Sequence, residues 1–434
     1  MIFNYGLEFE KTIDDNWSTP SGNNYDNCAE ENADDKVNFA LSLLDRVIQC
    51  MGVDLCQKEL QIIISSYLKK TWEYQYMALY ALSTYSSFDQ EMVSIEPVLE
   101  LIYKLMSANE DKLRFSAIHC INKFCDNYNP SFQKQTITKL IPLFQELLKK
   151  ENVLRCQCEL IDALISFIQF TTSDALKPYT KELFELLFVV FNKPEIPLII
   201  RKLILEAILE IISTMEEEIT PLAPVAFDIL IKYFVESYKT KSNQNLYGIL
   251  IECITSIGIY VKDKYKQVVP DIVKCIVEIV KGLNSDKIEP LKADLTNSLE
   301  RLLPVLQESF INLLPDLVDA VITLIKLRPK MAISSSPEKE FDVSDIYDTK
   351  DQKQKKDEIQ TSETEDLASA LVLLNTIIET IEDLFSPYVD KIEGEILELI
   401  TYKADTKVRT KSSKIIPNLL TPLTDLNLQK ETAK

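Results

Sequence analysis

Apolar residues recur along most of the chain at spacings of three and four, beginning near Val37. Phe39, Leu43, Leu44 and Val47 share one side of a helical wheel. The same spacing returns at Leu60, Ile63, Ile64, Tyr67 and Leu68. Such spacing is typical of amphipathic helices, whereas half-buried strands alternate apolar and polar residues. The pattern therefore predicts an all-α protein.

The predicted helices come in pairs, and the pairs repeat with a period typical of HEAT or armadillo units. First helices align on Arg114, Arg155, Arg201 and Arg409, and second helices often open with a proline, as at Pro130. The pairs are expected at 37–51/54–69, 72–86/91–107, 111–127/130–150, 153–170/174–192, 197–214/218–238, 242–260/263–283, 287–304/307–327 and 362–382/385–401, followed by a terminal helix at 404–420. The sequence thus predicts a HEAT-repeat superhelical solenoid, armadillo-like, of about eight to nine helix pairs.

Two polar stretches interrupt this pattern. Residues 1–36 are rich in Asp, Glu, Asn and Ser, and we expect them to form an acidic flexible arm. Residues 329–361 are charged and poor in apolar residues, and we expect a charged inserted loop. HEAT repeats then occupy 37–328, and 362–434 holds further repeats and the C-terminal end.

Composition narrows the class of partner. The chain has 67 acidic against 47 basic residues and a net charge of -20, so most of its surface repels a nucleic-acid backbone and favours a basic partner. Only 7 glycines occur in 434 residues, which suits helices joined by short polar corners. The nine cysteines are interpreted as buried thiols in a reducing compartment. We expect a soluble intracellular protein without a leader, without membrane insertion and without direct contact to nucleic acid.

The chemistry of catalysis is missing from the sequence. The single histidine, His119, lies mid-helix and is interpreted as a packed or surface helical residue rather than a general base. Cys156 and Cys158 are two residues apart on a helix, so they cannot easily share a metal. No phosphate-binding glycine loop and no nucleophile elbow occurs. We therefore expect no catalytic residues, no metal and no cofactor.

Carboxylates are the remaining functional candidates. Acidic clusters such as Glu216–Glu218 are usually solvated helix ends. In a solenoid, however, one helix of each pair lines the concave side, and carboxylates at equivalent repeat positions would form a ladder for lysine and arginine side chains.

Several segments resemble a known family in order along the chain. They are YLKKTWEYQYMALYALSTYSSF, DKLRFSAIHCINKFCDNYNPSFQKQ, NLYGILIECITSIGIYVKDKY and SPYVDKIEGEILELITYKADTKVRTKSSKIIPNLL. Together they resemble the importin-β (karyopherin-β) superfamily of nuclear transport receptors, and within it the importin beta-3 type. The resemblance spans roughly 37–422 and implies a HEAT superhelix.

The resemblance also implies a function. It predicts a nuclear import receptor, or its central segment, that binds basic nuclear localisation signals, contacts Phe-Gly nucleoporins, shuttles between cytoplasm and nucleus and releases cargo to Ran-GTP. The chain corresponds to the middle of a family member, so the N-terminal repeats expected to bind Ran are missing, and we expect an excised piece or a reduced homologue.

The family's cargo-binding acids map near the C-terminal ends of consecutive first helices. Asp45 keeps the acid, whereas Ser87, Asn127 beside Asp126, and Gln169 replace the others. The resemblance thus assigns cargo binding to Asp45, Ser87, Asp126, Asn127 and Gln169, and it leaves the cargo preference open.

A second interpretation stays open at this point. A HEAT-repeat scaffold or regulatory subunit for a phosphatase, a kinase or another assembly has the same period and charge, and neither property separates it from an import receptor.

Overall fold

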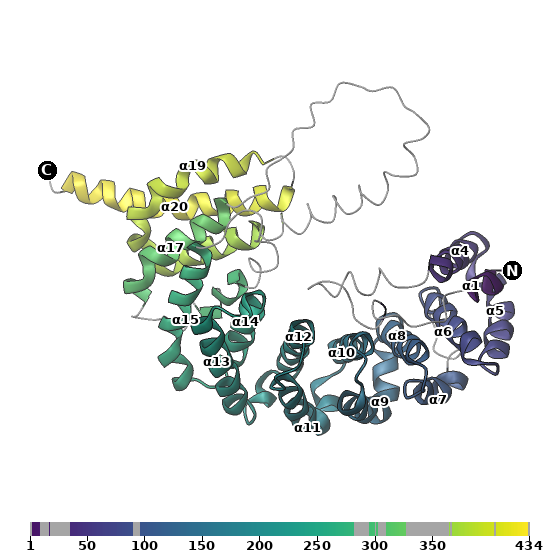
Figure 1. Cartoon of the computed structure of the whole chain (residues 1–434). Helices are drawn as coiled ribbons and strands as arrows, with labels where there is room; N and C mark the ends of the chain where they lie inside the picture. The colour runs from purple at the N-terminus through teal and green to yellow at the C-terminus, as the bar shows by residue number, and fades with distance from the viewer. Residues whose placement is uncertain are drawn as a thin grey trace. The chain divides into compact units, whose positions relative to one another are not determined.

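The structure is a computed structural model and describes residues 2–8, 17, 35–89, 96–281, 295–299, 301–302, 310–326, 364, 367–402 and 405–432 (Figure 1). Within these residues, every regular element is an α-helix or a 3₁₀-helix. The described part of the chain is therefore all-α, as the apolar spacing predicts. The helices divide into two compact units, Met1–Ala226 (unit 1) and Phe227–Lys434 (unit 2).

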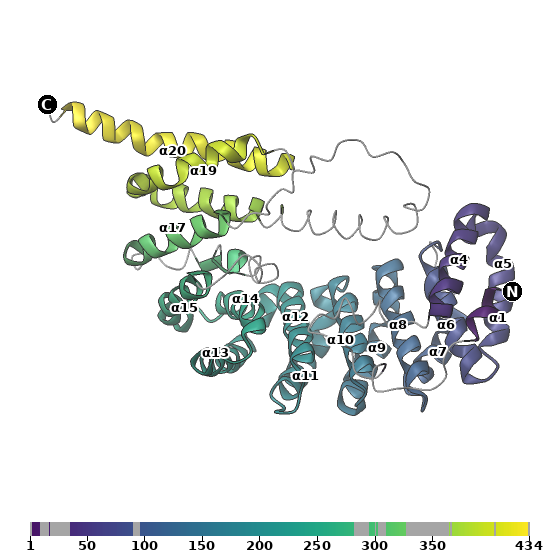
Figure 2. The ribbon, with the colours of Figure 1, turned by 45° about the horizontal axis from the view of Figure 1, so that its top comes forward.

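The helices of unit 1 form two layers, which Figures 1 and 2 show side by side. The inner layer consists of α4 (Asp35–Met51), α6 (Trp72–Ser86), α8 (Asp111–Asn127), α10 (Leu154–Gln169) and α12 (Leu198–Met215). The outer layer consists of α5 (Val53–Tyr67), α7 (Glu96–Leu105), α9 (Ser131–Lys150) and α11 (Ser173–Phe191). Consecutive inner helices pack directly on one another, so the closely spaced inner layer is the hollow side of the stack.

Outer helices pair with the inner helix that follows them. The contact of α5 with α6, α9 with α10 and α11 with α12 is more extensive than the contact of each outer helix with the inner helix before it. The structural repeat therefore begins with the outer helix, one helix later than the sequence pattern suggests. The helix boundaries themselves agree with the predicted ranges to within a few residues in most of unit 1.

Aromatic side chains connect the two layers inside unit 1. The Phe132 ring of α9 lies 5.8 Å from Phe124 of α8 and 6.5 Å from Phe167 of α10, and all three side chains are fully buried. Burying each ring stabilises the fold by about 2 kcal/mol. A single ring thus joins one outer helix to two neighbouring inner helices.

Arginines near the start of inner helices bind the loop before them. Arg114 donates to the carbonyl oxygens of Ala108 and Asn109 and pairs with the buried Glu151 at 2.8 Å. Arg201 likewise donates to the Lys193 carbonyl at 2.7 Å. These contacts satisfy carbonyls that the preceding turn leaves open. Arg155, aligned with them by sequence, lies instead against Trp17 on the inner face.

Unit 2 continues the helical pattern. Its elements are α13 (Ala223–Thr240), which begins in unit 1, then α14 (Tyr247–Gly258), α15 (Asp263–Lys281), helical residues at 295–299 and 301–302, α17 (Phe310–Lys326), helical residues at 367–381, η6 (Glu382–Tyr388), α19 (Val389–Ile400) and α20 (Thr406–Thr432). At the end of α14, Gly258 lies so close to Tyr265 of α15 that a Cβ atom would be 2.5 Å from the ring. A hydrogen atom at this position allows the two helices to approach.

Exposed lysine–carboxylate pairs join neighbouring helices in each unit. In unit 1, Lys139 of α9 pairs with Glu100 of α7, and Lys177 of α11 pairs with Glu218 at 2.6 Å. In unit 2, the pairs are Lys264–Asp228, Lys281–Asp316 and Lys391–Asp319. We call these contacts the lysine–carboxylate pairs.

The segment expected to be a flexible arm is held to unit 1 at two described places, which corrects that expectation for these residues. Helix α1 (Ile2–Gly6) packs on α4, with Phe3 buried 5.5 Å from the Tyr67 ring. Trp17 is buried between α8 and α10. The rest of the expected arm, at 9–16 and 18–34, lies outside the described residues, as does the expected insertion at 329–361.

No helix in the described ranges is long and apolar enough to cross a membrane. Of the cysteines, Cys56, Cys120, Cys125, Cys156, Cys158 and Cys253 are buried, Cys275 is half-buried and Cys50 is exposed, whereas Cys28 lies outside the described residues.

Candidate functional site

A row of polar side chains crosses from α8 to α10 on the inner layer of unit 1. His119 Nδ1 lies 3.0 Å from Glu159 Oε1, and the amide nitrogen of Asn122 donates to Glu159 at 3.2 Å and to Asp162 at 2.7 Å. The spacing of these residues places them on one face of each helix. We call His119, Asn122, Asp126, Glu159 and Asp162 the inner acidic cluster.

Burial sets the electrostatics of this cluster. Glu159 is only 1% exposed. Burial, together with the charge of Glu159, raises the pKa of Asp162 to about 6. Burial also raises the pKa of Asp126 from its usual value. A carboxyl group whose pKa is raised by burial is stabilised in its charged form when a cation lies beside it. Asp162, which is half-buried, and Asp126, which is exposed, are the carboxylates of this cluster that an ammonium or guanidinium group can reach.

Helix C-termini extend this row along the inner layer. Ser87 caps the C-terminus of α6, Asn127 ends α8 and Gln169 ends α10, and all three side chains are exposed. Asn127 donates to Ser86 Oγ at 2.7 Å and to Ser87 Oγ at 3.4 Å. The last carbonyls of a helix and its dipole attract positive charge. These ends add acceptors for a basic peptide.

The structure brings together some of the residues assigned by resemblance and leaves others apart. Ser87 and Asn127 are joined by the hydrogen bond above, and Asp126 precedes Asn127. Asp45 lies on α4, half-buried, and accepts a hydrogen bond from Gln49 at 2.7 Å within its own helix. Gln169 shares the inner layer through α10. Asp45 and Gln169 thus lie on the same layer as the other three residues but on different helices.

Sequence reasoning missed Asn122, Glu159 and Asp162. A signal was present, since His119 and Glu159, and likewise Asn122 and Asp162, are each 40 residues apart. Equal offsets place residues at equivalent repeat positions on adjacent inner helices. Reading both helices in this register would have identified the cluster.

Among the described residues, no group of three or more His, Cys, Asp or Glu side chains is arranged to hold a metal ion. Burial raises the pKa of the Cys120 and Cys125 thiols well above the ordinary value, which keeps them protonated and unreactive.

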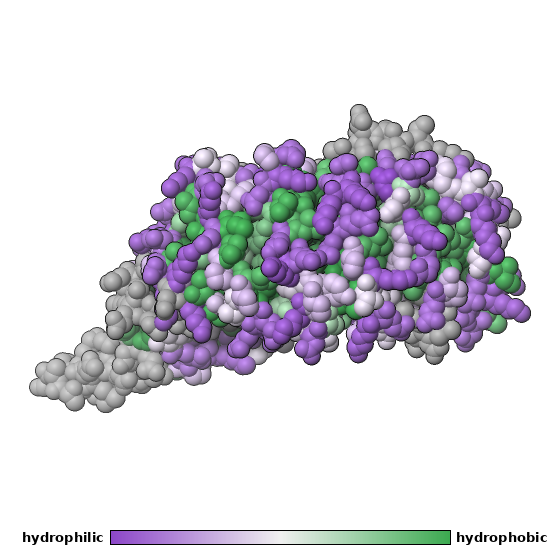
Figure 3. All heavy atoms as spheres, turned by 90° about the horizontal axis from the view of Figure 1, so that it is seen from below, coloured by the Kyte–Doolittle hydropathy of each residue, from purple (hydrophilic) through white to green (hydrophobic). Residues whose placement is uncertain are grey.

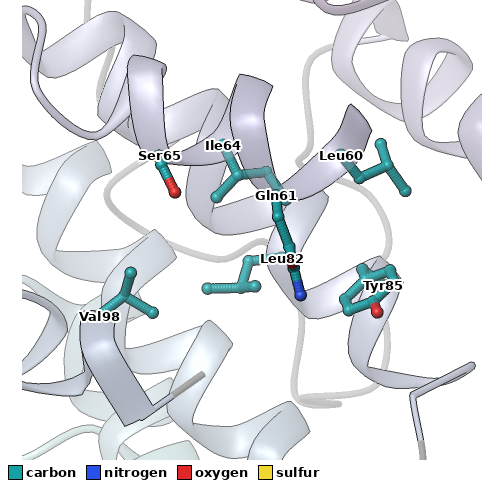
Figure 4. A pocket seen from close by; sticks show the side chains of 7 residues that line it. All are labelled: Leu60, Gln61, Ile64, Ser65, Leu82, Tyr85 and Val98. Carbon is teal, nitrogen blue, oxygen red and sulfur yellow. The ribbon is translucent and has the colours of Figure 1, made fainter. Parts of the chain in front are cut away.

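A separate apolar pocket opens between α5 and α7, with α6 as its floor (Figure 4). Its enclosed volume is about 20 Å³. It is lined by Leu60, Gln61, Ile64, Ser65, Leu82, Tyr85 and Val98. In the view of Figure 3, apolar side chains are visible between polar ones on the outer surface. The pocket is thus a shallow, mostly apolar depression on the surface of unit 1, too small as it stands to enclose an aromatic ring.

Comparison with known proteins agrees with this architecture. No family model matches the chain. The chain is 23% identical over 390 residues to "Importin subunit beta-3" of Saccharomyces cerevisiae, covering 88% of this chain and 35% of that protein. This match confirms the resemblance found from the sequence segments. The chain thus spans about a third of the length of this curated relative.

Solved structures of Kap121p share the fold. The match to Kap121p bound to Pho4p has a TM-score of 0.72 at 19% identity, covering 98% of this chain and 40% of that chain. The match to Kap121p bound to RanGTP has a TM-score of 0.68 at 19% identity, covering 98% of this chain and 41% of that chain. The match to Kap121p bound to Nup53p has a TM-score of 0.71 at 20% identity, covering 98% and 40%. The predicted helical repeat solenoid is therefore confirmed.

Proposed function

We propose that the chain acts as a nuclear import receptor of the importin beta-3 type, or as the central segment of one, and binds basic nuclear localisation signals on the inner layer of unit 1. The inner acidic cluster is the observation that carries this proposal. Glu159 is buried, Asp162 is half-buried and Asp126 is exposed, and all three belong to the consecutive inner helices α8 and α10. The similarity to importin subunit beta-3 supports the same class of ligand.

Binding follows from charge and hydrogen bonding. A lysine ammonium that approaches the half-buried Asp162 donates up to three hydrogen bonds, and each bond to a carboxylate is charge-assisted. The ammonium also lowers the pKa of Asp162 from about 6, so binding below that pH releases a proton. Asp126, Asn127 and Ser87 then offer acceptors to the next basic side chains of an extended peptide.

Passage and release complete the proposed cycle. The apolar depression between α5 and α7 would contact the phenylalanine ring of a Phe-Gly nucleoporin segment, because its lining is mostly apolar. Ran-GTP would release the cargo, and the protein would shuttle between cytoplasm and nucleus. Kap121p has been solved in complexes with RanGTP and with Nup53p, which supports the same partners here. In this proposal the chain binds and does not catalyse.

The test is the affinity of a fluorescein-labelled lysine-rich import-signal peptide, measured by anisotropy at low and physiological salt, with and without Ran-GTP. The double variant Asp126→Asn/Asp162→Asn keeps side-chain shape and removes two charges, so we expect affinity to fall about 10-fold. Glu185→Gln, on the exposed face of α11, is the matched control.

Three outcomes are informative. Salt-sensitive binding that weakens in the double variant but not in Glu185→Gln supports the inner acidic cluster. Loss of the peptide with Ran-GTP supports release. Absence of binding at both salt concentrations would favour a general HEAT scaffold over an import receptor. Asp45→Lys should also weaken the peptide, and unchanged affinity would remove Asp45 from the surface.

A further inference from the structure

Trp17 is held on the inner face of unit 1 by residues of two neighbouring inner helices. Its indole lies 6.0 Å from the Phe115 ring of α8, edge to face at 78°. The Arg155 guanidinium of α10 is 4.9 Å from the centre of the indole ring, and the Lys112 ammonium of α8 is 5.8 Å away. One apolar ring and two cations therefore surround one tryptophan.

Burial shows that this is a fitted contact. Trp17 is 8% exposed, and Arg155 is 2% exposed. Lys112 and Phe115 are buried as well. Arg155 and Lys112 therefore lie over the indole away from bulk solvent, where a cation–π contact is stronger than at an exposed site. The face of an indole ring is the strongest aromatic partner for such cations.

The same site adjoins the inner acidic cluster. Phe115 precedes His119 by one helical turn on α8, and their rings are stacked 6.1 Å apart. Arg155 precedes Glu159 by one turn on α10. A peptide side chain that contacts the exposed edge of the inner acidic cluster would therefore lie close to Trp17.

We propose that Phe115, Lys112 and Arg155 form a socket for a tryptophan side chain and that Trp17 is its tethered ligand, which competes with a basic peptide for the inner face of unit 1. The competition rests on the proposed function, whereas the socket does not. Tethering keeps the indole at high effective concentration, so an incoming peptide must displace it to use the full inner acidic cluster.

The chain contains only two tryptophans, so Trp72→Phe leaves Trp17 as the sole fluorescent indole. In this background we expect blue-shifted emission and protection from acrylamide. Arg155→Gln removes the stacked cation and should lower the ratio of docked to undocked Trp17 roughly 5- to 30-fold. Emission then shifts to the red and quenching rises. Phe115→Ala should act in the same direction.

Lys123→Gln provides the matched control, because it removes a cation from α8 away from Trp17 and should leave emission unchanged. Circular dichroism and the urea midpoint show that each variant is folded. Emission that is already red-shifted in the Trp72→Phe background, or that stays protected in both Arg155→Gln and Phe115→Ala, would overturn the socket.

The competition has its own measurement. Trp17→Ala should bind the lysine-rich peptide severalfold more tightly than the unmodified chain does. Unchanged or weaker binding would overturn the competition. The socket would still be tested separately by the fluorescence measurement. If no peptide binds either protein, the proposed function fails, and the fluorescence result still decides whether the socket exists.

Discussion

His119 and Glu159 occupy equivalent positions on adjacent inner helices, and their side chains meet at 3.0 Å between Nδ1 and Oε1. This contact brings a buried carboxylate to within reach of Asn122, which in turn holds Asp162. The repeat itself assembles the inner acidic cluster, because residues 40 positions apart occupy equivalent places on α8 and α10.

Replacing Asp162 by Asn should stabilise the free protein at neutral pH. Burial raises the folded-state pKa of Asp162 to about 6, above its value in an unfolded chain, so the native state holds its proton more tightly. Stability from this group is therefore present below about pH 4 and is lost as pH rises through about 6. Asp162→Asn should raise the free energy of unfolding by about 1–3 kcal/mol at pH 7 and leave it nearly unchanged at pH 4.

Urea unfolding of Asp162→Asn and the unmodified chain between pH 4 and pH 8 measures this difference. Glu185→Gln on the exposed face of α11 controls for the change in net charge. A stabilisation that is the same at pH 4 and pH 7 would show that Asp162 does not titrate abnormally.

Restoring acids at the helix ends should strengthen basic-peptide binding. Ser87→Glu/Asn127→Asp adds two carboxylates where an exposed hydroxyl and amide now meet. Affinity for the lysine-rich peptide should rise about 10-fold and become more sensitive to salt. Ser107→Glu, exposed in the loop between α7 and α8, adds charge outside this surface, and an equal gain in that variant would contradict the assignment.

Gly258→Ala should destabilise unit 2. A Cβ atom at this position would lie 2.5 Å from the buried Tyr265 ring, so α14 or α15 must shift. Such overpacking costs about 1–3 kcal/mol, which thermal or urea unfolding detects. Gly394→Ala, where a Cβ atom meets nothing within 4 Å, is the control and should not destabilise the protein.

Filling the pocket between α5 and α7 should abolish Phe-Gly binding. Val98→Glu places a charge at the wall of this apolar pocket, and a phenylalanine ring gains nothing from contacting a site that contains a charge. Binding of a Phe-Gly repeat segment, followed by NMR line broadening, should be lost. Val189→Glu, exposed on α11, is the control, and equal loss there would place the contact elsewhere.

The helices of this protein were predictable because amphipathic spacing is a local property. Helix α8, for example, was predicted at 111–127 and is observed at Asp111–Asn127. Which helix begins a repeat was not predictable in this way, since it depends on contacts between helices. The alignment of Arg155 with Arg114 failed for the same reason, because only the packed structure shows that Arg155 points to Trp17.

The candidate site was predicted in part. Ser87 and Asn127 were found through resemblance, and the structure joins them by a hydrogen bond. Glu159 was overlooked because a charged residue within a helical sequence normally faces solvent, and nothing local indicates that His119 and Asn122 from the next helix cover it. Partners that are distant in the sequence decide the environment of such a carboxylate. The sequence of one helix therefore does not show that the carboxylate is buried.

The lysine–carboxylate pairs have a mechanical consequence. An exposed ion pair contributes about 0–1 kcal/mol to stability, which is close to the thermal energy. Each lysine–carboxylate pair therefore adds only a small resistance to the separation of the two helices that it joins. The inner helices, joined by direct packing, resist separation far more strongly. In unit 1, the outer layer can therefore open by small steps while the inner layer acts as the hinge. Stiffness against bending should then fall gradually as salt rises, without any single cooperative transition.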